Sequence, residues 1–161
     1  MIQIIDNFFD SQIHLDVKNF CKTKLFYSPA FTADNNYYGL RSIVSKLDII
    51  DLFKEQAKKK FKINISKIHK DTGIDIRNLD KLIPHKDPQS ILNLFIMIQG
   101  DEELNNGIVF YNDKKINTHI GFKENRAILF NSDIVHSPFI FKEQTIKRIT
   151  ATLFITDYKF I

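Results

Sequence analysis

The chain has 161 residues, of which 43% are hydrophobic, 26% charged and 12% aromatic. These proportions are typical of globular proteins and exclude a disordered or fibrous chain. The length predicts one domain over residues 1–161. The formal net charge of +4 favours an anionic partner, but only four of the 23 basic residues are Arg. Because base recognition depends mainly on Arg, the composition argues against nucleic acid as the main partner.

The sequence predicts neither a membrane span nor a signal peptide. No stretch reaches the roughly 18 consecutive apolar residues that a spanning helix needs, and residues 1–10 lack a basic start and a small-residue cleavage site. The one cysteine, Cys21, cannot form an internal disulfide, so we expect a reducing, cytoplasmic location. Cys21 itself is interpreted as a small core residue rather than a nucleophile.

The first part of the chain predicts a short strand over residues 2–5 and two helices. The first helix spans about 11–25 with Asp10 or Ser11 as its cap, and the second spans about 46–60 with Ser45 as its cap. The segment between them, 27–42, contains Pro, Gly and Asn and predicts a loop. The apolar positions expected to face the core are Ile13, Val17, Phe20 and Cys21 in the first helix and Leu47, Ile50, Phe53 and Ala57 in the second.

The rest of the chain predicts strands. Residues 61–68 and 74–79 alternate between apolar and polar, and 91–99 is a long apolar run, as in a strand buried on both faces. The turn signal Asn105-Asn106-Gly107 precedes a strand over 108–111. Two helices followed by about eight short strands predict a mainly β (α+β) fold, a jelly-roll barrel or sandwich with both helices on one outer face. The last three predicted strands are 127–130, 138–141 and 146–156.

Three residues have the character of metal ligands. His85 and Asp87 stand two residues apart, and on an extended segment such residues point to the same side. The pair can therefore present an imidazole and a carboxylate to one metal ion. His136, which follows the predicted strand 127–130, is the candidate third ligand. Together they would form a 2-His-1-carboxylate facial triad with open coordination positions, whereas structural zinc sites normally have four protein ligands.

A second constellation lies on the last predicted strand, where Arg148 comes twelve residues after His136. Alternation places Arg148 and Thr150 on the same face, with Thr152 and Phe154. A buried Arg and a buried Thr both need polar partners, and a guanidinium with a neighbouring hydroxyl matches a carboxylate well. The sequence therefore predicts a carboxylate receptor downstream of the metal triad.

In order and spacing, these residues resemble the iron(II)- and 2-oxoglutarate-dependent oxygenases, particularly the prolyl 4-hydroxylase-like branch. Segment 106–111 resembles the Gly-Gly-x-x-Phe hairpin of that family, with Asn106 in place of the first Gly, and segment 4–9 resembles its lead-in to the first helix. The residues that match the family motif are His85, Asp87, His136, Arg148 and Thr150.

The resemblance implies a double-stranded β-helix and a dioxygenase that acts as a hydroxylase. The triad would hold iron(II), with 2-oxoglutarate as cosubstrate, O2 as oxidant and ascorbate as a stimulant of turnover. Arg148 and Thr150 would bind the distal carboxylate of 2-oxoglutarate, which is converted to succinate and CO2. The branch favours a small-molecule or peptide substrate that carries an amino-acid side chain, prolyl among them.

Five further residues are candidates for the site. Asn93, the inward polar residue of segment 91–99, and Tyr111 are proposed cosubstrate contacts. Tyr37, Tyr38 and Arg41 lie in segment 31–41, a candidate lid, and are proposed substrate contacts. Their simpler interpretation is packing or satisfaction of a backbone group. At the level of the whole protein, the alternatives are an inactive jelly-roll module that binds a metal or ligand, and an oxygenase that acts on nucleic acid.

Overall fold

The computed structural model describes residues 1–161 except 32–34, 36, 78–82 and 140–145. The elements are, in chain order, β1 (Ile2–Ile5), α1 (Ser11–Thr23), β2 (Ser28–Phe31), β3 (Tyr37–Ile43), α2 (Ile49–Phe61), β4 (Ile63–Ile68), β5 (Gly73–Arg77), β6 (Leu92–Gln99), β7 (Gly107–Asn112), β8 (Lys115–Gly121), β9 (Arg126–Asn131), β10 (His136–Phe139) and β11 (Arg148–Phe160). None of the helices in the described ranges is long and apolar enough to cross a membrane.

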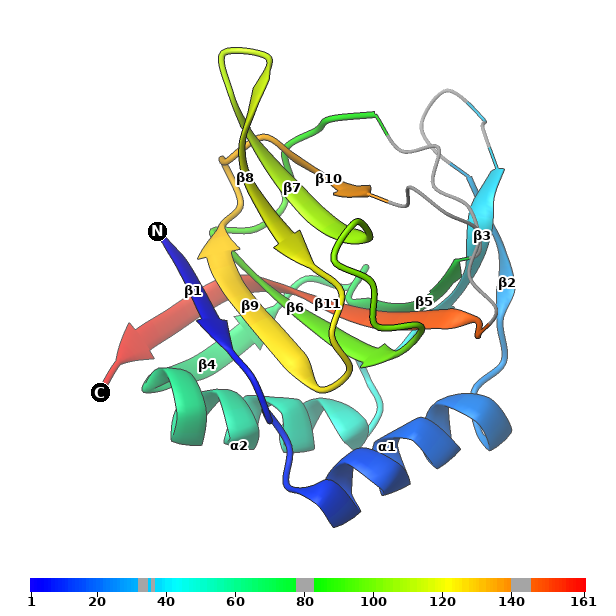
Figure 1. Cartoon of the computed structure of the whole chain (residues 1–161). Coiled ribbons are helices and arrows are strands. Elements are labelled where there is room, and N and C mark those ends of the chain that lie inside the picture. Colours follow the sequence, from blue (N-terminus) through cyan, green and yellow to red (C-terminus); the bar gives the residue numbers. More distant parts are fainter. Residues whose placement is uncertain (32–34, 36, 78–82, 140–145) are drawn as a thin grey trace.

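Most strands belong to one large antiparallel sheet with the order β1-β9-β6-β11-β5-β3-β2, in which β4 also pairs with β11. Strands β10, β7 and β8 form a smaller sheet. The small sheet lies over one face of the large sheet, and α1 and α2 lie against the other face (Figure 1). This arrangement is the predicted jelly-roll with both helices on one side.

Two apolar clusters hold the layers together. The larger one joins the helices to the large sheet and contains Val17, Phe53 and the alternate residues Ile149, Ala151, Leu153 and Ile155 of β11. The smaller one fills the space between the two sheets, with Phe95, Phe110 and Phe130 among its members. The alternation predicted for the last strand is thus confirmed, and it directs Arg148 and Thr150 away from the helices.

Cys21 lies in the larger cluster with 0% of its surface exposed. Burial raises the pKa of its thiol to about 12, so the thiol stays protonated and unreactive at ordinary pH. The interpretation of Cys21 as a core residue is confirmed.

Several element boundaries differ from the sequence-based expectation. Segment 27–42 is not a loop, because it contains the strands β2 and β3 at one edge of the large sheet. Pro29 is tolerated there because β2 is the outermost strand. The second helix begins at Ile49 and not at residue 46, and Asp48, not Ser45, is its N-cap. Leu47 lies in the preceding turn and is 41% exposed, so it is not part of the apolar stripe.

Strand β8 was absent from the expectation. It forms a hairpin with β7 through a turn in which Asp113 and Lys114 have φ of 46° and 66°. Two successive left-handed residues are characteristic of a type I′ turn, which normally carries Asn or Gly.

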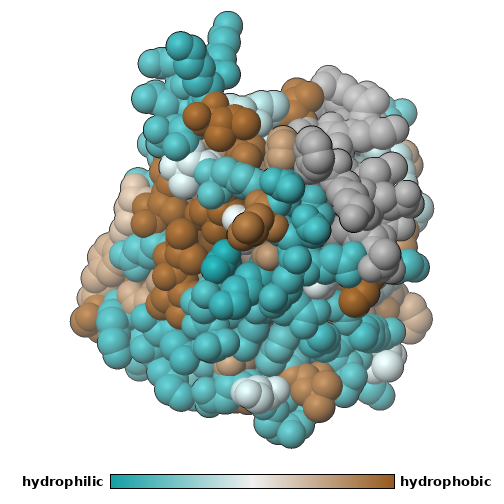
Figure 2. Space-filling model, viewed as in Figure 1, coloured by the Kyte–Doolittle hydropathy of each residue, from teal (hydrophilic) through white to brown (hydrophobic). Residues whose placement is uncertain are grey.

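On the face viewed in Figure 2, apolar surface gathers over β1 and β9, while the surface over the two helices is mainly hydrophilic.

Candidate active site

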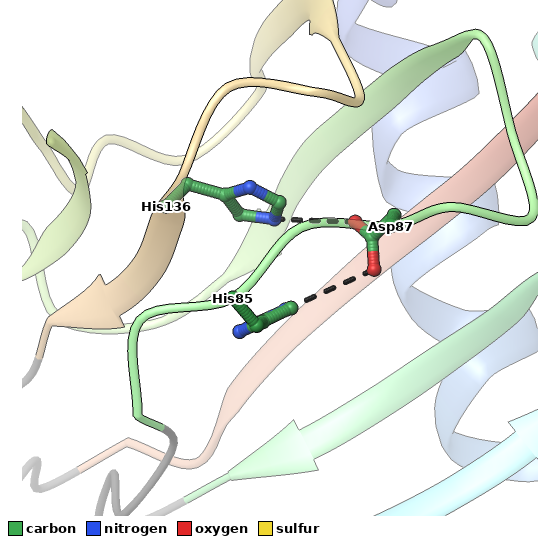
Figure 3. A group of neighbouring side chains, drawn as sticks. All are labelled: His85, Asp87 and His136. Atoms are coloured by element: carbon green, nitrogen blue, oxygen red, sulfur yellow. Dashed lines mark ion pairs between the residues drawn. The ribbon is translucent and has the colours of Figure 1, made fainter. Parts of the chain in front are cut away.

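The side chains of His85, Asp87 and His136 converge between the two sheets (Figure 3). One ligand atom from each of them lies within 4.8 Å of the others. Nε2 of His136 is 3.2 Å from Oδ2 of Asp87, and Nε2 of His85 is 3.8 Å from Oδ1. The structure therefore brings together all three predicted metal ligands, although His136 is 49 residues from Asp87 in the sequence.

Backbone hydrogen bonds set the positions of the three residues. The amides of His85 and His136 each donate to the other's carbonyl oxygen, both at 2.9 Å, which joins the two segments as an antiparallel bridge. The amide of Asp87 donates to the carbonyl of Ser132 at 3.1 Å. The His-x-Asp segment is therefore held as an extended chain beside the start of β10, as the i, i+2 argument requires.

Both imidazoles are oriented in the same way. Nδ1 of His85 lies 2.9 Å from the carbonyl oxygen of Ile83, and Nδ1 of His136 lies 2.9 Å from that of Ile134. Because a carbonyl oxygen only accepts, each Nδ1 carries the proton and donates it. In the neutral imidazole this leaves Nε2 as the atom with a free lone pair, and both Nε2 atoms face Asp87.

The electrostatics of the site favour the protonation states that ligate a metal. Burial lowers the pKa of His85, and the charges of His136 and Arg77 act in the same direction. Burial alone would raise the pKa of Asp87, but the hydrogen bond that His136 donates when it is protonated, the positive charge of either imidazole in that state and the amide of Asn93 together hold it below its ordinary value. The site thus favours a neutral His85 and an ionised Asp87, as metal binding requires.

Asn93 is fully buried on β6 and contacts the triad through Asp87. Its Nδ2 donates to Oδ2 of Asp87 at 2.6 Å, and its Oδ1 accepts from the hydroxyl of Ser90 at 2.7 Å. The structure thereby gives Asn93 a role that the sequence did not indicate, which is to fix the rotation of the Asp87 carboxylate. Its contact with a cosubstrate stays a prediction.

A cavity of about 400 Å³ opens beside the triad. On the large sheet, Phe95, Thr152 and Phe154 contribute to its wall, together with Tyr38, Arg41 and Arg77 from the β3–β5 edge. The cavity wall is therefore mainly apolar near the centre of the large sheet, whereas toward that edge it carries two guanidinium groups and the exposed carboxylate of Asp71.

None of the predicted cosubstrate residues contributes to the lining of this cavity. Arg148 is 1% exposed, donates from Nη2 to the carbonyl of Gly107 at 2.9 Å, and has its guanidinium 5.1 Å from the centre of the Phe122 ring. Thr150 is also buried, on the same face of β11. The hydroxyl of Tyr111 lies 3.0 Å from that of Ser137.

The three proposed substrate residues separate into two groups. Tyr38 and Arg41 line the cavity, whereas Tyr37 is 51% exposed and packs edge-on against Phe31 within the β2–β3 hairpin. Of the candidate lid, residues 32–34 and 36 lie outside the described residues.

Neither a protein-family model nor a curated protein matches the chain. Solved structures do. A 2OG-Fe(II) oxygenase family oxidoreductase from Burkholderia pseudomallei superposes with a TM-score of 0.68 at 11% identity, over 98% of this chain and 84% of that one. A prolyl-4-hydroxylase from Pseudomonas putida gives 0.60 at 9% identity, over 96% and 92%. The α-ketoglutarate-dependent epimerase SnoN from nogalamycin biosynthesis gives 0.62 at 7% identity, over 99% and 80%.

The fold is that of the 2OG-Fe(II) oxygenases. At these identities the likeness establishes the fold, and the chemistry has to be argued from the residues of the site. Arg77 and Asp75, which lie on the inner face of β5, were not predicted from the sequence as site residues. In the sequence of β5, apolar and polar residues alternate, as they do in a strand with one solvent-exposed face. Alternation alone therefore predicts that Asp75 and Arg77 face solvent.

Proposed function

We propose that the protein is an iron(II)- and 2-oxoglutarate-dependent dioxygenase that hydroxylates an amino-acid or peptidyl side chain, such as prolyl, with release of succinate and CO2. The proposal rests on one observation above all. Two imidazole nitrogens with free lone pairs and one carboxylate meet at the wall of a cavity. Three protein ligands of this kind suit iron(II) and leave coordination positions for other molecules.

The donor set fits that metal. His85 and His136 would ligate through Nε2, since Nδ1 of each is committed to a backbone carbonyl. Asp87 would ligate through Oδ1, because Oδ2 accepts from Asn93. When bound, iron(II) with 2-oxoglutarate and O2 supplies the oxidising power for attack on an unactivated C–H bond.

The other residues of the chain would position and shield the reactants. Arg148 and Thr150 would receive the distal carboxylate of 2-oxoglutarate, in a buried setting where a charge-assisted hydrogen bond is strong. Phe95 and Phe154 would keep water away from the reacting C–H bond, since both line the cavity. Asn93 would hold Asp87 in the orientation that ligation requires.

The test is turnover of labelled 2-oxoglutarate with iron(II), ascorbate and O2, with pooled amino acids and peptides as substrates. The expected result is succinate and CO2 from the wild type and neither product from His85→Ala. His119→Ala is the matched control, because His119 is exposed on β8. Binding of iron(II) and 2-oxoglutarate with no decarboxylation across the panel would identify an inactive binding module instead. A nucleoside and oligonucleotide panel covers the remaining alternative.

A further inference from the structure

Arg77, the last residue of β5, is a buried cation in the wall of the proposed active-site cavity. It is 8% exposed and lines the same cavity as His85, Asp87 and His136. Its guanidinium packs against the ring of Tyr38, 4.8 Å from the ring centre. Among the described residues, neither its Nε nor its Nη1 has a hydrogen-bond partner. Leaving buried donors unpaired is costly, so a native protein that does so normally reserves them for another group.

Asp75, the carboxylate that lies beside Arg77 among the described residues, does not satisfy it. Asp75 is 1% exposed, and both of its oxygens accept from Nη1 of Arg41 at 2.9 Å. Burial alone would lower the pKa of Arg41, but the charge of Asp75 raises it overall. The carboxylate of Asp75 is therefore paired with Arg41. Nη2 of Arg77 is 3.5 Å from Oδ2 of Asp75, too long for a strong hydrogen bond. Asp71, also on the cavity wall, is mostly exposed and lies 3.5 Å from His69.

Among the buried groups at this edge of the cavity, two guanidinium groups and one carboxylate leave one positive charge unmatched, while the exposed carboxylate of Asp71 lies beside His69. A group with one negative charge and planar geometry neutralises it best, and a carboxylate has both properties. Gly73 at the start of β5 supports the same arrangement. A Cβ on Gly73 would lie 2.8 Å from Nε of Arg41, so the absent side chain gives the Arg41–Asp75 pair its room beside Arg77.

Arg77 is distinct from the proposed cosubstrate receptor, although the two are neighbours in the sheet. Arg77 pairs with Arg148 across the β5–β11 ladder, so both side chains start on the same inner face. From there they diverge. Arg148 reaches Gly107 on β7 and Phe122, whereas Arg77 turns to Tyr38 on β3. Like charges directly opposite one another destabilise a sheet, and their divergence toward different partners favours two anion subsites over one.

We propose that Arg77, backed by Tyr38, binds a carboxylate of the prime substrate and thereby restricts that substrate to molecules that carry a carboxylate near the oxidised carbon. The identity of the reaction rests on the proposed function. The existence of the carboxylate subsite rests on the cavity and on the contacts of Arg77. A free amino acid or a small carboxylic acid meets the requirement, whereas an internal prolyl residue of a peptide has no carboxylate of its own at that place.

The test uses the full chain and the side-chain Nε–H signals of its arginines in ¹H–¹⁵N NMR. The sequence has only four Arg residues, so single substitutions assign every signal. The probe is butyrate, with butyramide as its neutral match, added to the protein with and without Zn(II) and 2-oxoglutarate. We expect butyrate to shift the Arg77 signal saturably and butyramide not to. Arg77→Met should weaken butyrate binding about tenfold or more, as followed by the amide signals of β3, and Arg77→Lys should fall between.

Arg126 on β9 provides the control, because it already forms an ion pair with Asp6 at the surface. Equal shifts of Arg126 and Arg77 with butyrate would show only general ion binding and would overturn the subsite. So would a shift of Arg77, and not of Arg148, on addition of 2-oxoglutarate, since Arg77 would then be the cosubstrate receptor. If Zn(II) and 2-oxoglutarate fail to bind while butyrate still binds at Arg77, the subsite stands and the proposed oxygenase function is the part that fails.

Discussion

The side-chain amide of Asn93 donates a 2.6 Å hydrogen bond to Oδ2 of Asp87, and this bond connects the centre of the large sheet to the metal triad. The same amide accepts from Ser90, which precedes β6. Because Asn93 is held from both sides, it fixes which carboxylate oxygen remains available on Asp87. Such partners of metal ligands raise affinity by orienting the ligand before the metal arrives.

Substitution of Asn93 by Ala should therefore weaken metal binding by about 10- to 100-fold. The carboxylate of Asp87 would lose its orienting donor but keep its charge. The measurement is Co(II) or Fe(II) affinity by competition with a chelator of known strength. Asn117→Ala is the matched control, since Asn117 is exposed on β8 and bonds only to Thr118 among the described residues. Unchanged affinity in Asn93→Ala would remove this residue from the metal site.

Gly107 at the start of β7 is expected to tolerate no side chain. Its φ is +146°, and a Cβ there would collide with the backbone carbonyl of Ile120 on β8. Gly107→Ala should cost about 2 kcal/mol or more, which corresponds to a Tm about 5 °C lower. It should also weaken 2-oxoglutarate binding, because the carbonyl of Gly107 holds Arg148.

Gly121→Ala is the comparison for that variant, since Gly121 is the register partner of Gly107. A Cβ on Gly121 would come 3.2 Å from the backbone of Leu104, in a residue that is 86% exposed. That neighbour can yield, so the loss of Tm should be smaller. Equal losses in the two variants would show that the left-handed backbone of Gly107 is not the cause.

Asp6 should make the stability of the fold depend on acid. Hydrogen bonds from Arg126 and Lys123 lower the pKa of Asp6 from 3.8 to about 2, against the opposing effect of burial. Because the pKa is depressed in the folded state, the contribution to stability is present above about pH 4 and is lost as the pH falls toward 2. The group is partly exposed, so about 0.5–1 kcal/mol is expected for the cluster.

Asp6→Asn should therefore lower Tm by about 1–3 °C near neutral pH, and the difference from wild type should shrink toward pH 2. Thermal unfolding at a series of pH values measures this. Asp16→Asn is the control, as Asp16 lies exposed on α1 and accepts from Gln12. A difference between Asp6→Asn and wild type that stays constant with pH would contradict the assignment.

The sequence predicted those strands that carry many large apolar side chains. The run in β6 and the alternation in β11 both correspond to observed strands, because large apolar side chains must be buried. Strand β8 was missed since most of its side chains are exposed and its only buried residue is Ile120. Its turn uses Asp113 and Lys114 in left-handed conformations, so the Gly that normally predicts such a hairpin is absent.

The same dependence on local sequence pattern explains which residues of the site could be predicted. His85 and Asp87 were predictable because an i, i+2 pair on an extended segment needs no long-range information. Asp75 and Arg77 have the same spacing, but their strand reads as one with a solvated face. Only the second sheet and the β3 edge turn that face into a cavity wall. Long-range contacts of this kind set the role of Asn93 as well.

We propose that Arg148 distinguishes 2-oxoglutarate from other ligands of an iron triad. It is buried at the start of β11, on the same face as Thr150, and its neighbour Lys147 is exposed. Arg148→Met keeps the apolar contact with Phe122 but removes the charge, and should weaken 2-oxoglutarate binding by about 30-fold or more, at about 1.4 kcal/mol per decade. Arg148→Lys should fall between, because it keeps the charge and loses the planar donors. Lys147→Met should change little, and metal affinity should hold in all three.

Anaerobic titration of the iron(II) protein with 2-oxoglutarate, followed by charge-transfer absorbance, measures each affinity. Wild-type affinity in Arg148→Met would mean that another group holds the cosubstrate, and Arg77 would be the first to examine.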